Sequence, residues 1–287
     1  MQDVCVAHLV RAKNSIEPLQ RFLESYGRNP GGVEHDLLFI LKGFHNEDVP
    51  AATSDLLDRY PHQKLFVPDN GFDVMPYLFT ASTYENNYFC FLNSFSILLD
   101  PDWLKKMHSI ITGEDVGIVG ATGSYQSMYS DLANFYELVL TTPFYRRVLS
   151  TFTIPMRMRK LKRDFYPFPN HHIRTNAFMI EGRLMRKVKI KPVHTKMDAY
   201  HFESGKDNLT RQILEMGLEA LVVGRDGKAY KKEEWYRSFT FWHGDQGNLL
   251  VADNQTNAYM AADLERKWQL ARHAWSNKAN PLETYVV

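Results

Sequence analysis

Short apolar runs alternate with amphipathic stretches through the first hundred residues of the chain. The runs lie at 4–10, 36–41, 64–68 and 88–92. Each has the length and composition of a strand that is buried on both faces. Helical spacing is found between the runs, at 16–26, 49–60 and 74–83. Strands that alternate with helices over short links predict a mostly parallel, doubly wound α/β sheet.

The second half of the chain is less regular. We expect a helix from Pro101, helical structure over about 125–161, a helix after 203–205 and a last helix over 256–275. We expect strands at 116–120, 173–180 and 221–223. Ser15 is the predicted N-cap of the first helix. The segment 253–256 is predicted to cap the last helix through Asn254 or Thr256, with a ligand role as the alternative.

Composition limits the classes of protein that this chain can belong to. The 287 residues can bury a large core, and no linker divides them, so we expect one domain with a regular half at about 1–110 and a less regular half at about 111–287. The net charge of +1 gives no global field for nucleic acid. We find neither a membrane span nor a signal peptide, and we expect Cys5 and Cys90 to be buried thiols of a cytoplasmic protein.

A basic segment interrupts this neutral pattern near the middle of the chain. Five cationic residues at 157, 159, 160, 162 and 163 alternate with Met156, Met158 and Leu161. One hypothesis is an amphipathic surface that touches anionic lipid, as a peripheral contact at the inner membrane. The alternative, which we favour from sequence alone, is a solvated basic face.

Polar residues end the fourth apolar run abruptly. Asn93, Ser94 and Ser96 follow Tyr88–Leu92 directly. In open α/β sheets, ligands bind in the crevice at the carboxyl ends of the strands. These side chains therefore lie where chemistry is expected, unless they only turn the chain into the next helix.

The order of these motifs resembles the large glycosyltransferase family that includes cellulose and chitin synthases, built on the GT-A fold. The loop Val10–Asn14 is similar to the segment that meets the nucleotide, and Asp69-Asn70-Gly71-Phe72-Asp73 to the segment around base and ribose. Phe91–Ser96 falls where the family carries its metal-binding Asp-x-Asp, and Thr175–Ile180 resembles the strand beside the acceptor. More narrowly, Phe-Leu-Asn-Ser, Gly-Ala-Thr-Gly-Ser, Phe-Glu-Ser-Gly-Lys and Ala-Asp-Asn-Gln-Thr resemble a group of uncharacterised bacterial glycosyltransferase-like proteins.

The resemblance implies a nucleotide-binding half at about 1–110, an acceptor-side half at about 111–287, and roles for particular residues. Glu203 falls where the family places its general base, with Asp207 and Asp198 behind it; the alternative is that Glu203 or Asp207 only caps a helix. Arg11, His243 and Gln246 are the candidates for the leaving diphosphate, and Asn176 lies beside the acceptor. The expected donor-binding residues are Arg11, Asn14, Asp69, Asn70, Asp73, Asn93 and Ser94.

The central motif departs from the family in a way that concerns metal. Mn²⁺ or Mg²⁺ bridging a diphosphate needs hard, anionic oxygen ligands, and Asn93 and Ser94 offer neutral ones. Unless Asp69, Asp73 or a distant histidine such as His243 contributes a ligand, we expect weak dependence on either ion.

We expect a transferase that moves a sugar (a hexose, by the resemblance) from a nucleotide-sugar donor onto a bacterial glycan or glycolipid precursor. An inactive GT-A module that binds nucleotide-sugar or glycan is the alternative, because the Asp-x-Asp is missing. A nucleotidyltransferase is more distant, since it would need paired acidic ligands and a glycine-rich phosphate loop near the first strand.

Overall fold

A mixed eight-stranded sheet forms the centre of the molecule. The structure is a computed structural model that describes residues 2–44, 48–140 and 150–286. The strands lie in the order β11 (Ala229–Tyr230), β10 (Glu219–Val223), β6 (Val116–Gly120), β9 (Ala177–Glu181), β4 (Tyr88–Leu92), β1 (Val4–Arg11), β2 (His35–Lys42) and β3 (Gln63–Val67). Two small ladders pair β5 (Ile97–Leu98) with β12 (Val251–Ala252) and β7 (Gly123–Ser124) with β8 (His172–Ile173).

The predicted α/β class with a mostly parallel sheet is confirmed. Neighbouring strands from β3 to β4 run parallel, as do β6 and β10. The exceptions are β9, which is antiparallel to both β4 and β6, and the edge strand β11. The strand expected at 173–180 is divided, because β8 pairs with β7 outside the central sheet before the chain enters β9.

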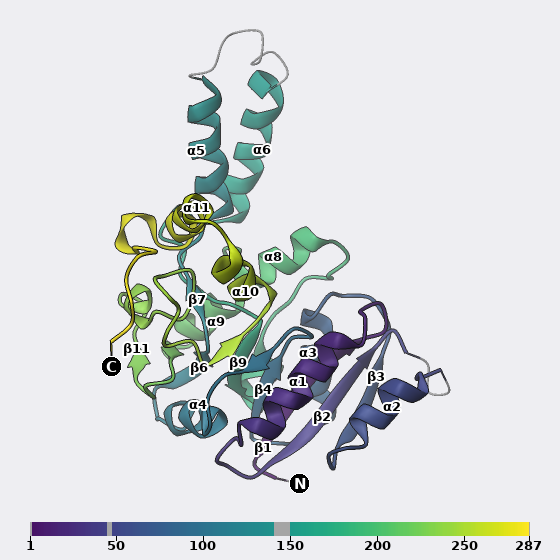
Figure 1. The fold of residues 1–287 in the computed structure, drawn as a ribbon. Coiled ribbons are helices and arrows are strands. Elements are labelled where there is room, and N and C mark those ends of the chain that lie inside the picture. The colour runs from purple at the N-terminus through teal and green to yellow at the C-terminus, as the bar shows by residue number, and fades with distance from the viewer. Residues whose placement is uncertain (1, 45–47, 141–149, 287) are drawn as a thin grey trace.

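Helices cover both faces of the sheet (Figure 1). One hydrophobic cluster joins the sheet to side chains of α1, α2 and α4, and the other joins it to side chains of α3, α7, α8 and α9. The bounds of the helices are α1 (Glu17–Arg28), α2 (Ala51–Leu57), α3 (Val74–Thr83), α4 (Trp103–Ile111), α5 (Met128–Leu140), α6 (Ser150–Asp164), α7 (Gly182–Lys187), α8 (Lys196–Ser204), α9 (Leu209–Glu215), α10 (Asn254–Ala261) and α11 (Leu264–Trp275).

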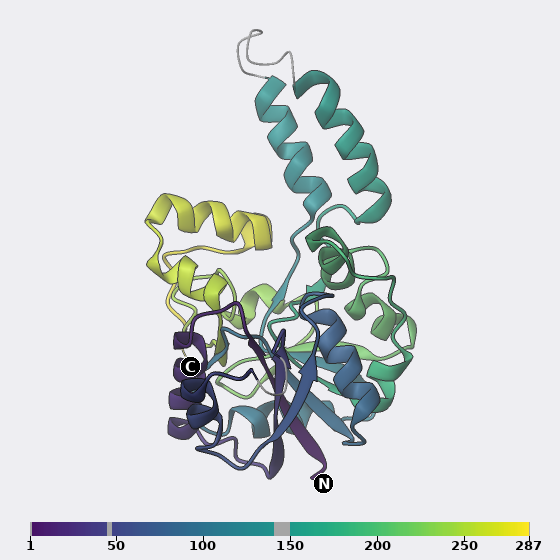
Figure 2. The same ribbon diagram turned by 90° about the vertical axis from the view of Figure 1, so that its right-hand side faces the viewer.

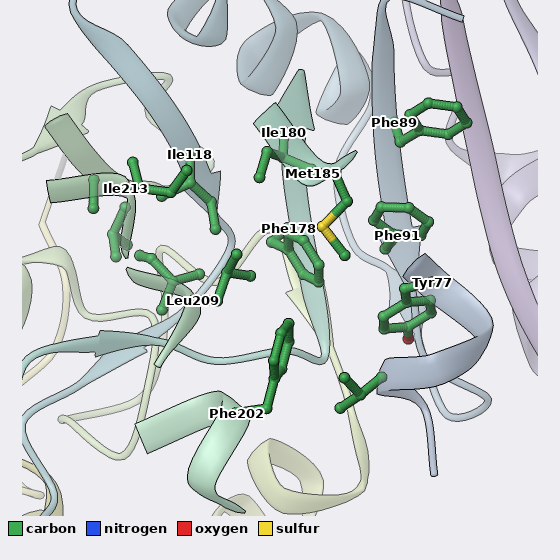
Figure 3. Close-up of a cluster of buried hydrophobic side chains, with 14 of the residues drawn as sticks. Tyr77, Phe89, Phe91, Ile118, Phe178, Ile180, Met185, Phe202, Leu209 and Ile213 are labelled. Atoms are coloured by element: carbon green, nitrogen blue, oxygen red, sulfur yellow. The ribbon is translucent and has the colours of Figure 1, made fainter. Parts of the chain in front are cut away.

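The strand β4 is buried on both faces, as its apolar sequence predicted. Phe89 and Phe91 point into one hydrophobic cluster, and Cys90 and Leu92 into the other. Figure 3 shows Phe91 beside Tyr77 of α3 and Phe178 of β9, and the ring centroids of Tyr77 and Phe91 are 4.7 Å apart. Cys90 and Cys5 are buried free thiols, as expected, and burial raises the pKa of each.

Two helices, α5 and α6, lie in the stretch of about 125–161 that was expected to be helical. They lie side by side and extend away from the sheet as a hairpin (Figures 1 and 2). The expected helical structure is confirmed for most of the described part of this stretch. Residues 141–149, which the expectation also covered, lie outside the described residues.

Three other local expectations need correction. The first helix starts at Glu17, and Ser15 does not cap it; the N-cap position is Ile16, without a side-chain hydrogen bond. The last helical region is two helices, α10 and α11, and the cap of α10 is Asp253, whose carboxylate accepts hydrogen bonds from the backbone N–H groups of Gln255 and Thr256. The helix α8 was not predicted, and it ends where a loop was expected.

Among the described residues, none of the helices is both long and apolar enough to cross a membrane.

Candidate functional site

Three cations surround Asp69 at the carboxyl edge of the sheet. Arg11 is the last residue of β1, and its guanidinium lies 2.9 Å (Nε) and 3.2 Å (Nη2) from the two Asp69 oxygens. Lys13 Nζ lies 2.8 Å from Asp69 Oδ2, and Lys42 Nζ lies 3.8 Å from Oδ1. The Arg11 hydrogen bonds, above all, hold the pKa of Asp69 down to about 2. Asp73 also lies near Arg11 and Lys42, so three cations face two carboxyl groups at this edge.

Lys42 is a buried cation that ends β2. Its side chain is 3% exposed, and Nζ donates a hydrogen bond to the backbone carbonyl of Phe72. Burial lowers the pKa of Lys42. Phe72 adopts a φ of +52°, a left-handed conformation that is strained for a phenylalanine. The backbone of the 69–73 segment is thus held in a special geometry against this ammonium group.

Glycine is required at position 43 for the loop after β2 to meet this segment. Gly43 has a φ of +77°, and a Cβ there would lie 3.0 Å from the Asp69 Cβ. A larger residue would therefore push Asp69 away from Lys42.

Glu203 lies in the last turn of α8, facing Thr175 just before β9. The Thr175 hydroxyl donates a hydrogen bond of 2.6 Å to Glu203 Oε2. No described residue forms a hydrogen bond with Glu203 Oε1, which leaves one oxygen able to accept a proton. Gly205 follows, and a Cβ there would lie 2.5 Å from the His201 carbonyl oxygen, so the close backbone approach expected at this glycine is made with α8 itself.

Asp73 connects Glu203 with the cations electrostatically. Burial raises the pKa of Asp73; the nearby Lys42 opposes that shift, and the charge of Glu203 adds to it. Tyr77 is fully buried one turn further along α3, and its hydroxyl has no hydrogen-bond partner in the described part of the chain. Burial raises the pKa of Tyr77, and the charges of Asp73 and Glu203 raise it further. The charges of Lys42 and Glu203 therefore both act on Asp73.

Amide side chains from β4 and β9 meet at the same edge of the sheet. The backbone N–H of Asn93 donates to the carbonyl of Asn176, at 2.8 Å. The Thr122 hydroxyl, which follows β6, donates to Asn176 Oδ1 at 2.7 Å. Ser94 lines a cavity of about 10 Å³ with Arg11 and Asn14, so the ends of β1 and β4 face a common space. The sheet brings together the side chains of Arg11, Asn14, Asn93 and Ser94 that the sequence predicted to be neighbours.

The side chains of the tail residues His243 and Gln246 form hydrogen bonds with other residues of the protein. His243 Nδ1 lies 2.5 Å from the carbonyl oxygen of Tyr236, and Nε2 lies 2.9 Å from Glu283 Oε2. Gln246 accepts from the backbone of Trp242 and donates to the carbonyl of Thr256. Both side chains are engaged in bracing the tail, which corrects the expectation that His243 offers a nitrogen to metal or diphosphate.

Asp198 and Asp207, the other two candidates for the general base, and Asn70 are not part of this cluster of polar side chains. Asp198 completes a capping box with Thr195 at the start of α8, and its side chain is exposed to solvent. Asp207 is 83% exposed and lies 3.8 Å from Lys191 Nζ. The cap of α9 is Asn208, so neither Glu203 nor Asp207 is the cap that the sequence offered as an alternative. Asn70 is exposed beside Asp69.

Sequence reasoning missed Lys42, Lys13 and Thr175 as site residues. Lys42 had a signal that could have been used, because a lysine that ends a buried apolar strand is placed at the crevice of a parallel sheet. Thr175 had none, since a threonine before a strand has many possible roles.

The described residues do not fit a divalent cation. They hold no group of three or more His, Cys, Asp or Glu side chains arranged to bind a metal ion. Asn93 Oδ1 accepts hydrogen bonds from the backbone N–H of Phe95 at 3.0 Å and from Ser96 Oγ at 3.1 Å. The two candidate ligands, Asn93 and His243, are therefore both occupied by the protein itself.

No family model matches the chain, and no curated protein matches it in sequence. A mannosyltransferase from Pyrobaculum calidifontis, solved with GDP-Man and Mn²⁺, is 11% identical at a TM-score of 0.46, over 96% of this chain and 69% of that one. Glucosyl-3-phosphoglycerate synthase from Mycobacterium tuberculosis, solved with Mn²⁺, UDP and phosphoglyceric acid, is 12% identical at 0.39, over 66% and 59%. S. aureus TarS with UDP is 12% identical at 0.33, over 41% and 34%. These are distant likenesses to glycosyltransferases, none supports a link to cellulose or chitin synthases, and none assigns a role to a residue of this chain.

Proposed function

We propose that this protein transfers a sugar from a nucleotide-sugar onto a hydroxyl group of a glycan or glycolipid precursor, on a GT-A-type α/β fold. The observation that carries the proposal is the group of cations Arg11, Lys13 and Lys42 around Asp69, with Glu203 near enough for its charge to act on Asp73. Such a transfer needs positive charge at the departing diphosphate and a base at the acceptor. We assign the first to the three cations and the second to Glu203.

The proposed chemistry assigns each group a definite task. Arg11, Lys13 and Lys42 stabilise the negative charge that grows on the nucleoside diphosphate as the glycosidic bond breaks. Glu203 Oε1 takes the proton of the acceptor hydroxyl as its oxygen bonds to the sugar carbon. Thr175 holds Oε2 and so orients the carboxylate.

Donor binding gives the first test. A nucleoside diphosphate that binds the folded protein alone should stabilise it by about 2.7 kcal/mol at a hundredfold excess over its dissociation constant. We expect the melting temperature to rise with one of the common nucleoside diphosphates and with the matching nucleotide-sugar. The variant Lys42→Met keeps about the length of the buried side chain but removes its charge. It should lose most of the rise in melting temperature. If no nucleotide shifts the wild-type melting temperature, the transferase proposal and the nucleotide-sugar-binding form of the inactive-module alternative both fail.

We also propose that the hairpin of α5 and α6 touches an anionic membrane surface. Phe135 is 54% exposed on α5 and Met156 is 73% exposed on α6. All five cationic side chains at 157, 159, 160, 162 and 163 are exposed, and within the described residues their only ion pair joins Arg163 to Asp164. Apolar and basic side chains on a projecting element suit the interface of a bilayer that contains anionic lipid.

Vesicle binding tests this surface. Each cation near an anionic bilayer contributes about 1 kcal/mol, so removing three should weaken binding by about a hundredfold. The variant is Arg157→Gln with Arg159→Gln and Lys160→Gln, measured by co-sedimentation with vesicles of phosphatidylcholine and phosphatidylglycerol in equal parts. The control removes three exposed charges from the body of the protein, at Lys187, Lys189 and Lys191. Equal binding by both triple variants would show that the basic segment is only a solvated face.

A further inference from the structure

The amide of Asn93 is oriented with its oxygen toward the protein and its NH₂ group free. A backbone N–H can only donate, so the group that faces Phe95 N at 3.0 Å must be Oδ1. Ser96 Oγ donates to the same oxygen. The two lone pairs of Oδ1 are therefore used within the turn, and no described residue accepts a hydrogen bond from Nδ2.

Asn176 is fixed in the same sense by a separate relay. Arg174 Nη1 lies 3.4 Å from Thr122 Oγ1, and that hydroxyl donates to Asn176 Oδ1 at 2.7 Å. Because Thr122 receives from a guanidinium, its own proton points to Asn176 Oδ1, so this oxygen is the acceptor and Nδ2 is the remaining donor. This Nδ2 is buried and has no partner among the described residues. A buried donor without a partner costs about 1–3 kcal/mol and indicates an absent ligand or water.

We propose that the ends of β4 and β9 bind the donor diphosphate directly, through the NH₂ groups of Asn93 and Asn176, in place of a bridging metal ion. Asn93 carries an unpartnered donor in the segment that resembles the metal-binding motif, and the buried Nδ2 of Asn176 is a second unpartnered donor on the residue whose carbonyl accepts from the Asn93 backbone N–H. Donors suit an anion and repel a cation, and the neighbouring Arg11 supplies the charge that the metal would supply. This inference rests on the proposed function and specifies how that site recognises its diphosphate.

Metal dependence of binding is the first arm of the test. The probe is whichever common nucleoside diphosphate stabilises the wild-type protein, titrated calorimetrically in EDTA and again in excess Mn²⁺. We expect the two dissociation constants to agree within about threefold, since the described residues hold no group of three or more His, Cys, Asp or Glu side chains that could bind the ion. Binding that requires Mn²⁺ overturns this inference and leaves the proposed function intact. Failure of every nucleotide to bind in either medium overturns the proposed function, and this inference with it.

The substitution Asn93→Asp is the second arm of the test, because it replaces only the NH₂ group of the side chain. The carboxylate keeps the acceptor for Phe95 N and Ser96 Oγ, so the turn persists, while the donors become a negative charge. We expect binding in EDTA to weaken by tenfold or more, the factor for losing a hydrogen bond to a charged group. Mn²⁺ should restore part of it, because an anionic oxygen now faces the diphosphate.

Two further variants keep this arm decisive. Asn134→Asp makes the same change at an exposed position on α5 and should bind as the wild type does. Asn176→Asp keeps the acceptor for Thr122 and should repeat the loss seen at Asn93, with its melting temperature without ligand showing that it is folded. Wild-type affinity in EDTA for a folded Asn93→Asp or Asn176→Asp protein would overturn the assignment of that amide.

Discussion

Replacing Glu203 by glutamine is expected to slow sugar transfer by a factor of about 10² to 10⁴, the usual contribution of a positioned general base. Glutamine keeps the shape of the side chain and its oxygen can still accept the hydrogen bond from Thr175. Folding and donor affinity should therefore change little. The rate is measured in a single turnover as release of nucleoside diphosphate from the bound nucleotide-sugar, with water or an added glycan as acceptor.

Two surface carboxylates provide matched controls for this result. Asp198→Asn removes a charge from a capping box, and Asp207→Asn removes one from an exposed position, so both should transfer at the wild-type rate. If Glu203→Gln is as fast as the wild type while one of these is inactive, the base lies there instead. If the wild-type protein binds nucleotide-sugar and no acceptor yields product, the inactive module becomes the better description.

The buried strands could be predicted because a strand that is buried on both faces is apolar at successive positions. The run Tyr88–Leu92 is apolar at successive positions, and both of its faces contact a hydrophobic cluster. Strand direction leaves no such pattern. The sequence of β9 is as apolar as those of β4 and β6, although β9 runs antiparallel to both. Only the pairing of β9 with these two strands shows its direction.

The candidate site was partly predictable for a related reason. The carboxyl ends of parallel strands lie at one edge of the sheet, however far apart they are in sequence. Arg11, Asn14, Asn93 and Ser94 could therefore be grouped from sequence. Residues of the tail could not be placed this way. His243 was expected to reach the diphosphate, and its orientation depends on Glu283, forty residues further along the chain. No local pattern encodes such a contact.

A buried ion pair beneath the proposed diphosphate site sets the second large expectation. Arg174 Nη2 lies 2.8 Å from Asp253 Oδ2, and the two side chains are 5% and 1% exposed. The same guanidinium lies 4.1 Å from the centre of the Phe241 ring and contacts Thr122, the residue that orients Asn176. The pair thus joins the segment before β9 to the cap of α10. Through Thr122 it also helps to hold the side chain of Asn176 in place.

Asp253→Asn should lower the free energy of unfolding by about 3–5 kcal/mol, because it leaves a buried guanidinium without its counter-charge. Asparagine caps helices about as well as aspartate, so the loss measures the charge and not the cap of α10. Urea denaturation gives the value, and Glu219→Gln, which breaks the exposed pair with Lys231, should cost less than about 1 kcal/mol. Adding Arg174→Met to Asp253→Asn should recover part of the loss, since the uncompensated charge is then gone. If Asp253→Asn costs no more than the exposed control, the pair does not hold this edge together, and the orientation of Asn176 must depend on Thr122 alone.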